Sequence, residues 1–140
     1  MKTSAVIILF LLPAISMAQS GPDLFFGVGI TGITSDQSIQ TGYSMTLGVL
    51  KNRFGFSNSI GYTESNEMKE IRSATFLAQP LFMLKQNFFV GFGPQLRIKS
   101  DDPMSVGYAG SVNFQAADIL LVSASWSKFE AFGLSLNLLF

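Results

Sequence analysis

The sequence predicts an all-β protein, an eight-stranded antiparallel up-and-down transmembrane β-barrel. Three observations support this prediction. Apolar residues alternate with small or polar residues along most of the chain from residue 24 onward. Longer polar connections mostly alternate with very short ones between these segments. The same alternation is found in barrels with long outside loops and tight periplasmic turns. Aromatic residues gather near the two ends of the segments, where the two membrane interfaces would lie.

The first 18 residues have the composition of a secretory signal peptide. Lys2 precedes an apolar run from Ala5 to Ile15, and Ser16-Met17-Ala18 supplies the small residues of a cleavage site. This run is shorter than the roughly 20 apolar residues that a membrane-spanning helix needs. We therefore expect residues 1–18 to be a signal peptide that is removed, and residues 19–140 to form one barrel domain.

The first four strands are expected at residues 24–33, 41–50, 53–63 and 72–84. In each strand one parity carries large apolar residues, which gives one face to lipid and the other to the barrel interior. The lipid-facing residues are Phe26, Val28, Ile30, Tyr43, Met45, Leu47, Val49, Phe54, Phe56, Ile60, Tyr62, Phe76, Ala78 and Phe82. Polar loops that begin at Thr34 and Glu64 alternate with tight turns at Lys51-Asn52 and Lys85-Gln86.

The last four strands are expected at residues 87–98, 104–115, 118–127 and 131–140. Their lipid-facing residues before the final strand are Phe88, Val90, Phe92, Leu96, Ile98, Val106, Tyr108, Val112, Phe114, Leu120, Val122, Ala124 and Trp126. A polar loop from Lys99, a tight turn at Ala116-Ala117 and a short connection at Lys128 to Glu130 join them. An even number of strands with the tight turns on the side of the termini places both termini in the periplasm.

Aromatic side chains of the lipid-facing set are expected at two heights. The outside belt consists of Tyr43, Tyr62, Tyr108, Trp126 and Phe132. The periplasmic belt consists of Phe26, Phe54, Phe82, Phe88, Phe114 and Phe140. A soluble β-sandwich, the alternative architecture with alternating strands, would bury its aromatic residues in a core. The two belts therefore favour the barrel.

The final segment alternates from Phe132 to Phe140, the last residue of the sequence. It resembles the C-terminal strand of bacterial outer-membrane proteins, whose final aromatic residue the assembly machinery recognises. The whole chain after the signal resembles the small eight-stranded barrels of the OmpX-like and porin-like kind, and its GFGPQL segment is similar to short porin-like proteins common in Bacteroidetes. The resemblance implies an outer-membrane location, contact with outer-membrane lipid and the assembly machinery, and a role for Phe140 as the assembly signal.

The inward-facing residues predict a barrel that is closed at one end. Bulky apolar residues occupy the inward positions toward the periplasm, namely Phe25, Leu50, Leu81, Met83, Phe89, Ile119, Leu121 and Leu139. Their volume argues against a through-pore in so narrow a barrel. Toward the outside the interior turns small and polar, with Gln95 and Arg97 as its largest side chains. These two residues predict a shallow outward cup that prefers anions, unless Arg97 only extends its charge to water at the mouth.

Two prolines, Pro80 and Pro94, fall within neighbouring strands and point toward lipid by parity. Proline has no N–H to donate, so each marks a bulge or an interrupted ladder. An irregular stretch on the lipid-facing wall, with Ala78, Pro80, Phe92 and Pro94, is a candidate surface for another outer-membrane protein. The alternative is a bulge that serves the barrel alone.

The composition leaves little chemistry for catalysis. The chain has no histidine and no cysteine, so it lacks the commonest general base, the commonest metal ligand and a thiolate nucleophile. The segment from Gly27 to Gly32 matches the dinucleotide pattern G-x-G-x-x-G but lies in a predicted strand with no helix after it. A calcium site at Asp101-Asp102 would need several further oxygen ligands. We therefore expect no enzyme activity, no cofactor and no metal.

The formal net charge is zero for the whole chain, so no basic field is available to attract nucleic acid. The predicted loops are short for an adhesin, which leaves the lipid-facing wall as the main usable surface. The sequence thus favours an accessory or structural subunit of a larger outer-membrane complex. The alternative is a solitary barrel that binds a small ligand or a lipid at its outward mouth.

Overall fold

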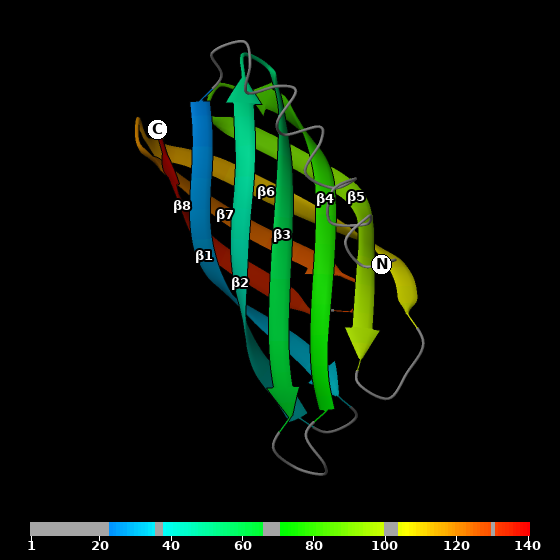
Figure 1. Cartoon of the computed structure of the whole chain (residues 1–140). Helices are drawn as coiled ribbons and strands as arrows, with labels where there is room; N and C mark the ends of the chain where they lie inside the picture. The colour runs from blue at the N-terminus through cyan, green and yellow to red at the C-terminus, as the bar shows by residue number, and fades with distance from the viewer. Residues whose placement is uncertain (1–22, 36–37, 66–70, 100–103, 130) are drawn as a thin grey trace.

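The chain is a closed barrel of eight antiparallel strands that follow one another in sequence order (Figure 1). The computed structural model describes residues 23–35, 38–65, 71–99, 104–129 and 131–140. The strands are β1 (Asp23–Ser35), β2 (Ser38–Lys51), β3 (Phe54–Ser65), β4 (Ile71–Lys85), β5 (Phe88–Lys99), β6 (Ser105–Ala117), β7 (Leu120–Ser127) and β8 (Phe132–Leu139). The predicted fold class is confirmed, and the predicted signal peptide lies outside the described residues.

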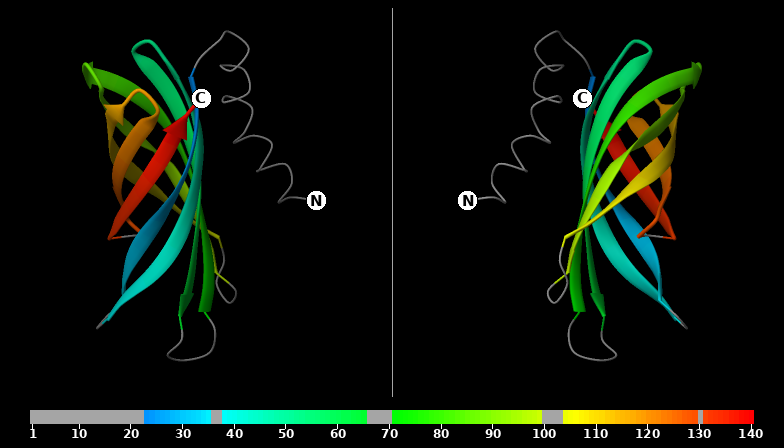
Figure 2. Two further views of the ribbon diagram at one scale, coloured as in Figure 1. Left: turned by 90° about the vertical axis from the view of Figure 1, so that its left-hand side faces the viewer. Right: turned by 90° about the vertical axis from the view of Figure 1, so that its right-hand side faces the viewer.

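The barrel closes where the first strand meets the last. The β1–β8 ladder runs from the pair Phe25 and Leu139 to the pair Gly32 and Phe132, and Figure 2 shows the two strands side by side. The C-terminus lies at the same end as the β2–β3 and β4–β5 turns (Figure 2). The backbone N–H of Phe140 donates to the carbonyl of Leu24 at 2.8 Å, so the ladder extends to the final residue. In the described part of the chain, no helix is long and apolar enough to cross a membrane.

The predicted alternation is confirmed along the strands. In β8 the outward residues from Phe132 to Leu138 are exposed, while Gly133, Asn137 and Leu139 are buried. The exposed large side chains on the other strands have the predicted parity as well. Three outward positions differ from the rest of the wall, since Val49, Asn58 and Ala78 have little exposed surface. Their place on the outer wall follows from strand pairing, in which Asn58 lies between Leu47 and Ala78.

The tight turns lie one or two residues later than predicted. They are Asn52-Arg53, Gln86-Asn87 and Asp118-Ile119, because β2, β4 and β6 continue to Lys51, Lys85 and Ala117. Asn52 and Asn87 have φ angles of 56° and 65°, a left-handed conformation that asparagine tolerates better than most residues. In β4 and β6 the register also shifts just before the turn, where a bulge adds one residue to the strand.

The connection between β1 and β2 is much shorter than the predicted polar loop from Thr34. Ladder pairing continues through Thr34 with Ile39 to Ser35 with Ser38, which leaves only residues 36–37 between the strands. The polar composition that indicated a loop therefore belongs largely to the outer ends of two strands. Strand ends are paired through the backbone, and this pairing places no apolar requirement on their side chains.

Strand register brings several residues of the predicted aromatic belts together. Tyr43 of the predicted outside belt lies opposite Tyr62. At the other end Phe54 lies opposite Phe82, with ring centroids 5.8 Å apart in an edge-to-face arrangement. Phe88 likewise lies opposite Phe114. Each of these three ladder pairs therefore places two aromatic side chains of one predicted belt side by side on the outer wall.

Candidate functional site

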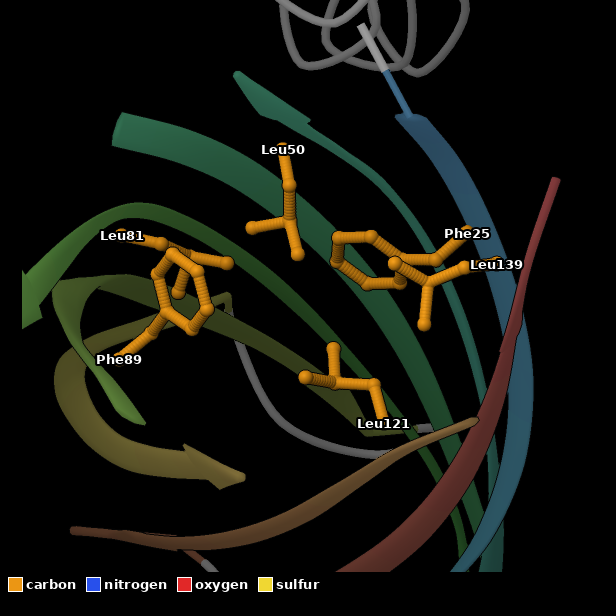
Figure 3. Close-up of a cluster of buried hydrophobic side chains, with 6 residues drawn as sticks. All are labelled: Phe25, Leu50, Leu81, Phe89, Leu121 and Leu139. Atoms are coloured by element: carbon orange, nitrogen blue, oxygen red, sulfur yellow. The ribbon is translucent and has the colours of Figure 1, made fainter. Parts of the chain in front are cut away.

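The end of the barrel that carries the tight turns is filled by apolar side chains (Figure 3). One buried cluster holds Phe25, Leu50, Leu81, Phe89, Leu121 and Leu139, with Met83 packed against it. Leu81 and Leu121 have no exposed surface. Small inward residues make room for the rings, since a Cβ at Gly48 would collide with the ring of Phe25. The predicted plug is confirmed, and we call this cluster the apolar plug.

Ile119 does not belong to the apolar plug, although the sequence predicted it there. The residue lies in the β6–β7 turn and is 66% exposed. The reason is the bulge near the end of β6, which moves the turn toward the C-terminus and takes Ile119 out of the alternating register. Its backbone carbonyl instead accepts a hydrogen bond from the N–H of Leu139 at 3.0 Å.

Above the apolar plug, a buried glutamine joins two strands that are not neighbours. Gln79 of β4 is 1% exposed, and its Nε2 donates to the carbonyl of Ala109 in β6 at 2.9 Å. The hydroxyl of Ser111 donates to Gln79 Oε1 at 2.8 Å. Gln79 spans β5 to make these bonds, and Gly91 of β5 leaves the room, because a Cβ there would lie 3.1 Å from Gln79 Oε1. The interior thus links β4 and β6 across the intervening strand.

A second buried amide, Asn137 of β8, organises the opposite side of the interior. Its Nδ2 lies within hydrogen-bonding distance of the carbonyl of Leu121 at 3.2 Å, the hydroxyl of Ser123 at 2.9 Å and that of Ser135 at 3.2 Å. Asn137 has no exposed surface. Its Oδ1 stands over Gly27, where a Cβ would not fit. Gly27 therefore allows close packing of β1 against β8, and the G-x-G-x-x-G segment lies within strand β1.

The outer half of the interior holds a small polar cavity of about 40 Å³. Most of its lining consists of hydroxyl and amide side chains, including Thr31, Ser57, Thr75, Gln79 and Gln95. Thr31 Oγ1 and Gln95 Oε1 have no hydrogen-bond partner. The space suits a few water molecules, which would satisfy these oxygens. It is far smaller than the roughly 300–1,000 Å³ of pockets that enclose drug-sized ligands.

Gln95 and Arg97 lie in β5, as the outward-cup hypothesis placed them, but their surroundings differ. Gln95 is 1% exposed and faces the polar cavity. Arg97 lies two residues further toward the outside and is partly buried, with its guanidinium carbon 5.6 Å from the ring centroid of Phe129. Lys128 Nζ lies 6.0 Å from the same centroid. Two cations therefore flank one aromatic ring at the mouth, an arrangement that the sequence did not indicate.

The outer wall is irregular where the two prolines lie. Pro80 and Pro94 are exposed, and so is Phe92, while Ala78 has the same outward parity. Between the pair Leu77 and Gln95 and the pair Leu81 and Gly91, the β4–β5 ladder has no bridging pairs. The strands nevertheless stay close, since a Cβ at Gly93 would collide with the carbonyl of Ala78. We call this stretch, residues 78–80 with 92–94, the proline seam.

Asn58 is a polar residue that the predicted lipid-facing set did not include. It has the outward parity of Phe56 and Ile60, with Leu47 and Ala78 beside it on the neighbouring strands. Neither its Nδ2 nor its Oδ1 has a hydrogen-bond partner. The signal that could have found it is its position, a lone carboxamide in an otherwise apolar series on β3.

The wall over β8, β1 and β2 is hollowed by an apolar groove of about 660 Å³. Its lining includes Val28, Ile30, Met45, Leu134 and Leu136. The groove offers shape and apolar area, and Tyr43 adds a hydroxyl to its lining. It can accommodate hydrocarbon chains.

The interior offers neutral donors and acceptors rather than reactive groups. Among the described residues, no three of His, Cys, Asp and Glu come together as they would around a metal ion. The predicted Asp101-Asp102 site lies outside the described residues. The amides and hydroxyls above the apolar plug can bind water and hold neighbouring strands together, so their role is to stabilise the barrel.

Comparisons with known proteins identify the fold. No family model matches the sequence, and no curated protein does either. Neisserial surface protein A matches with a TM-score of 0.60 and 13% identity over 86% of this chain and 96% of its own. Ail, the attachment invasion locus protein of Yersinia pestis, matches with a TM-score of 0.54 and 13% identity over 84% of this chain and 93% of its own.

A de novo designed transmembrane β-barrel also matches, with a TM-score of 0.58 and 6% identity over 86% of this chain and 96% of its own. A sequence chosen by design thus shares the architecture, which shows how little of it depends on a particular function. The chain has the fold of the small eight-stranded outer-membrane barrels. The finer similarity to porin-like proteins of Bacteroidetes stays a prediction.

Proposed function

We propose that this protein is a non-enzymatic outer-membrane barrel that acts as an accessory or structural subunit of a larger outer-membrane complex. The observation that supports this most is the apolar plug, from Phe25 to Leu139, which fills one end of the interior. With a cavity of only about 40 Å³ above it, the interior offers little room for a solute. The surface left for a function is the outer wall.

The outer wall offers features that an isolated barrel does not need. The proline seam interrupts a ladder in mid-strand, and Asn58 places an amide among apolar side chains. Association inside a membrane depends on shape and hydrogen bonds, because lipid chains are as apolar as the wall. The seam of rigid prolines gives one side of the barrel an irregular shape. There we expect Ala78, Pro80, Phe92 and Pro94 to contact another outer-membrane protein.

Cross-linking in cells tests this proposal. A photoreactive amino acid at Phe92, which is exposed on the proline seam, should capture a specific outer-membrane protein. The matched control is Trp126, an exposed aromatic residue on β7. Capture from Phe92 alone supports the subunit role. Equal capture from both sites, or lipid adducts only, would rule out the seam as the contact surface.

Membrane location and assembly are tested first. The chain should fractionate with the outer membrane and migrate differently on gels before and after boiling. Removal of Phe140 should reduce the folded fraction, because we expect the assembly machinery to recognise this residue. A control variant, Phe132→Leu, keeps an apolar side chain on the same strand and should assemble normally.

A second candidate function, ligand binding at the outward mouth, rests on Arg97 and Lys128 beside Phe129. Two cations at one point favour an anionic ligand. The structure of Ail in complex with the heparin analogue sucrose octasulfate provides a probe for this candidate. Calorimetry with sucrose octasulfate should give binding that is lost in Arg97→Gln with Lys128→Gln, whereas no heat at any concentration would exclude this candidate for polysulfated sugars.

A further inference from the structure

We propose that the barrel wall opens sideways between β4 and β5 at the proline seam, and that the side chain of Gln79 is the latch that holds it closed. This inference goes beyond the proposed function, because it concerns a movement of the wall and not a contact with another protein. It rests on the geometry of the seam and holds whether or not a partner contacts it.

The β4–β5 ladder is the part of the wall that is easiest to separate. Among the eight ladders that the described strands form, only this one loses its pairing in mid-strand. Pro80 lies on one strand of the gap and Pro94 on the other, and neither has an N–H to donate. Separation of a complete ladder in a membrane leaves backbone groups without partners. At the seam fewer such bonds have to be broken.

Gln79 lies in the middle of this gap and crosses it on the inner side of the wall. By register the residue across the gap is Gly93, which pairs in turn with Ala109 on β6. Gln79 Nε2 donates to the carbonyl of that same Ala109 at 2.9 Å, and the hydroxyl of Ser111 donates to Gln79 Oε1 at 2.8 Å. Two side-chain bonds to β6 thus hold β4 at the level where its ladder pairs with β5 are missing.

An opening at this place leads into the barrel interior. Leu77, Gln79 and Gln95 flank the gap, and all three line the polar cavity. Gly91 and Gly93 lie on the β5 side, and glycine in a strand gives the backbone extra freedom. Lipid chains offer no hydrogen bond to replace those of the Gln79 amide, so its release from β6 is costly. The latch therefore keeps the open state rare.

Thiol labelling of the purified full chain in lipid vesicles tests the opening. The chain has no cysteine, so one introduced cysteine is a unique probe for an uncharged, bilayer-soluble maleimide. Ala109→Cys places the probe inside the barrel beside the seam, at a residue that is 2% exposed. Thr31→Cys is the matched control, because Thr31 is also buried but lies on β1, four strands from β5. Thr31 lines the polar cavity, so a reagent that enters through the mouth reaches it.

Removal of the latch should separate the two probes. Gln79→Leu keeps a side chain of similar size but deletes both hydrogen bonds, so it should raise the labelling rate of Ala109→Cys by about tenfold. The labelling rate of Thr31→Cys should stay unchanged. An equal increase at both probes would indicate general loosening of the barrel and would overturn the inference, as would an unchanged rate at Ala109→Cys.

A second variant keeps the test decisive if Gln79→Leu does not fold. Pro80→Val with Pro94→Val supplies two N–H donors to the β4–β5 ladder and should slow the labelling of Ala109→Cys by about tenfold. An unchanged or faster rate in this folded variant would contradict an opening at the seam. Capture of a partner from Phe92 in cells is a separate measurement, so the opening and the proposed subunit role can fail independently.

Discussion

At the scale of single residues, the interior of this barrel depends on amides and glycines in matched positions. Gln79 reaches across β5 to β6, and Asn137 bonds to the adjacent β7. Gly91 and Gly27 leave the space that these two amides need. Each glycine faces inward where another strand's side chain lies across it. A narrow barrel filled by side chains requires such pairs of large and small residues.

Asn137→Ala should lower the free energy of unfolding by about 2 kcal/mol, because buried groups lose their hydrogen-bond partner. The groups affected include the carbonyl of Leu121 and the hydroxyl of Ser123. Urea unfolding in lipid vesicles measures the change. Ser135→Ala removes a single partly buried contact to the same amide and should lower the free energy by less than half as much. Equal losses for the two variants would contradict a central role for Asn137.

Gly93→Ala should prevent most of the chain from folding, whereas Gly107→Ala should be tolerated. A Cβ at Gly93 meets the backbone carbonyl of Ala78, which cannot move without breaking the barrel wall. A Cβ at Gly107 meets the ring of Phe129, 2.8 Å away, which can rotate, and lies 3.4 Å from Lys128 Cβ in an exposed connection. The fraction that shifts on gels after boiling measures folding. A normal folded fraction for Gly93→Ala would show that the strands can separate at the proline seam.

Residue patterns predicted whether nearly every side chain points inward or outward, because successive residues in a strand alternate between the two faces. They did not predict contacts that cross strands. Gln79 has inward parity in its strand, yet its bond to Ala109 depends on a register that no single strand encodes. Asn58 is the reverse case, because its parity was visible while its lack of a partner became visible only with all its neighbours in place.

At the scale of strands and turns, the errors of prediction gather at the turns. A bulge interrupts the alternation near the end of β4 and of β6. Assigning side-chain directions by alternation from the strand centre therefore places the end of each strand too early. Ile119 was misplaced for this reason. The first outside loop was overestimated because polar residues near Thr34 continue the ladder. Strand centres follow the apolar pattern, but strand ends follow backbone pairing.

The β4–β5 turn provides a test at this scale. Asn87 has a φ of 65°, a region that costs most side chains about 1–2 kcal/mol. Asn87→Ala should therefore destabilise the folded barrel by about 1 kcal/mol, and Asn87→Gly should be neutral or slightly stabilising. Gln86→Ala, one residue earlier in the same turn, is the control and should have little effect. Unfolding curves that show Asn87→Ala to be more stable than Asn87→Gly would contradict the left-handed geometry.

At the scale of the whole molecule, the barrel combines two different halves along its axis. Apolar side chains fill the end with the tight turns, and hydroxyls and amides fill the other. The predicted plug and the predicted polar outer half follow from composition, because the inward residues change from bulky and apolar at one end of the strands to small and polar at the other. The pair of cations beside Phe129 does not, since Arg97 and Lys128 come from different strand ends that only the closed barrel brings together.

The purified barrel should give no unitary conductance in planar bilayers, and removal of two rings from the apolar plug should change this. Phe25→Ala with Phe89→Ala deletes the two largest side chains of the cluster. The cavity above is lined by polar groups, so water that enters the emptied plug can join it, and we expect small openings. Phe54→Ala with Phe82→Ala removes two rings at the same end but on the outer wall, and this control should stay silent. Conductance from the unmodified chain would show that the apolar plug does not seal the barrel, whereas silence of the double plug variant in its folded state would place the barrier in the amide layer of Gln79 and Asn137.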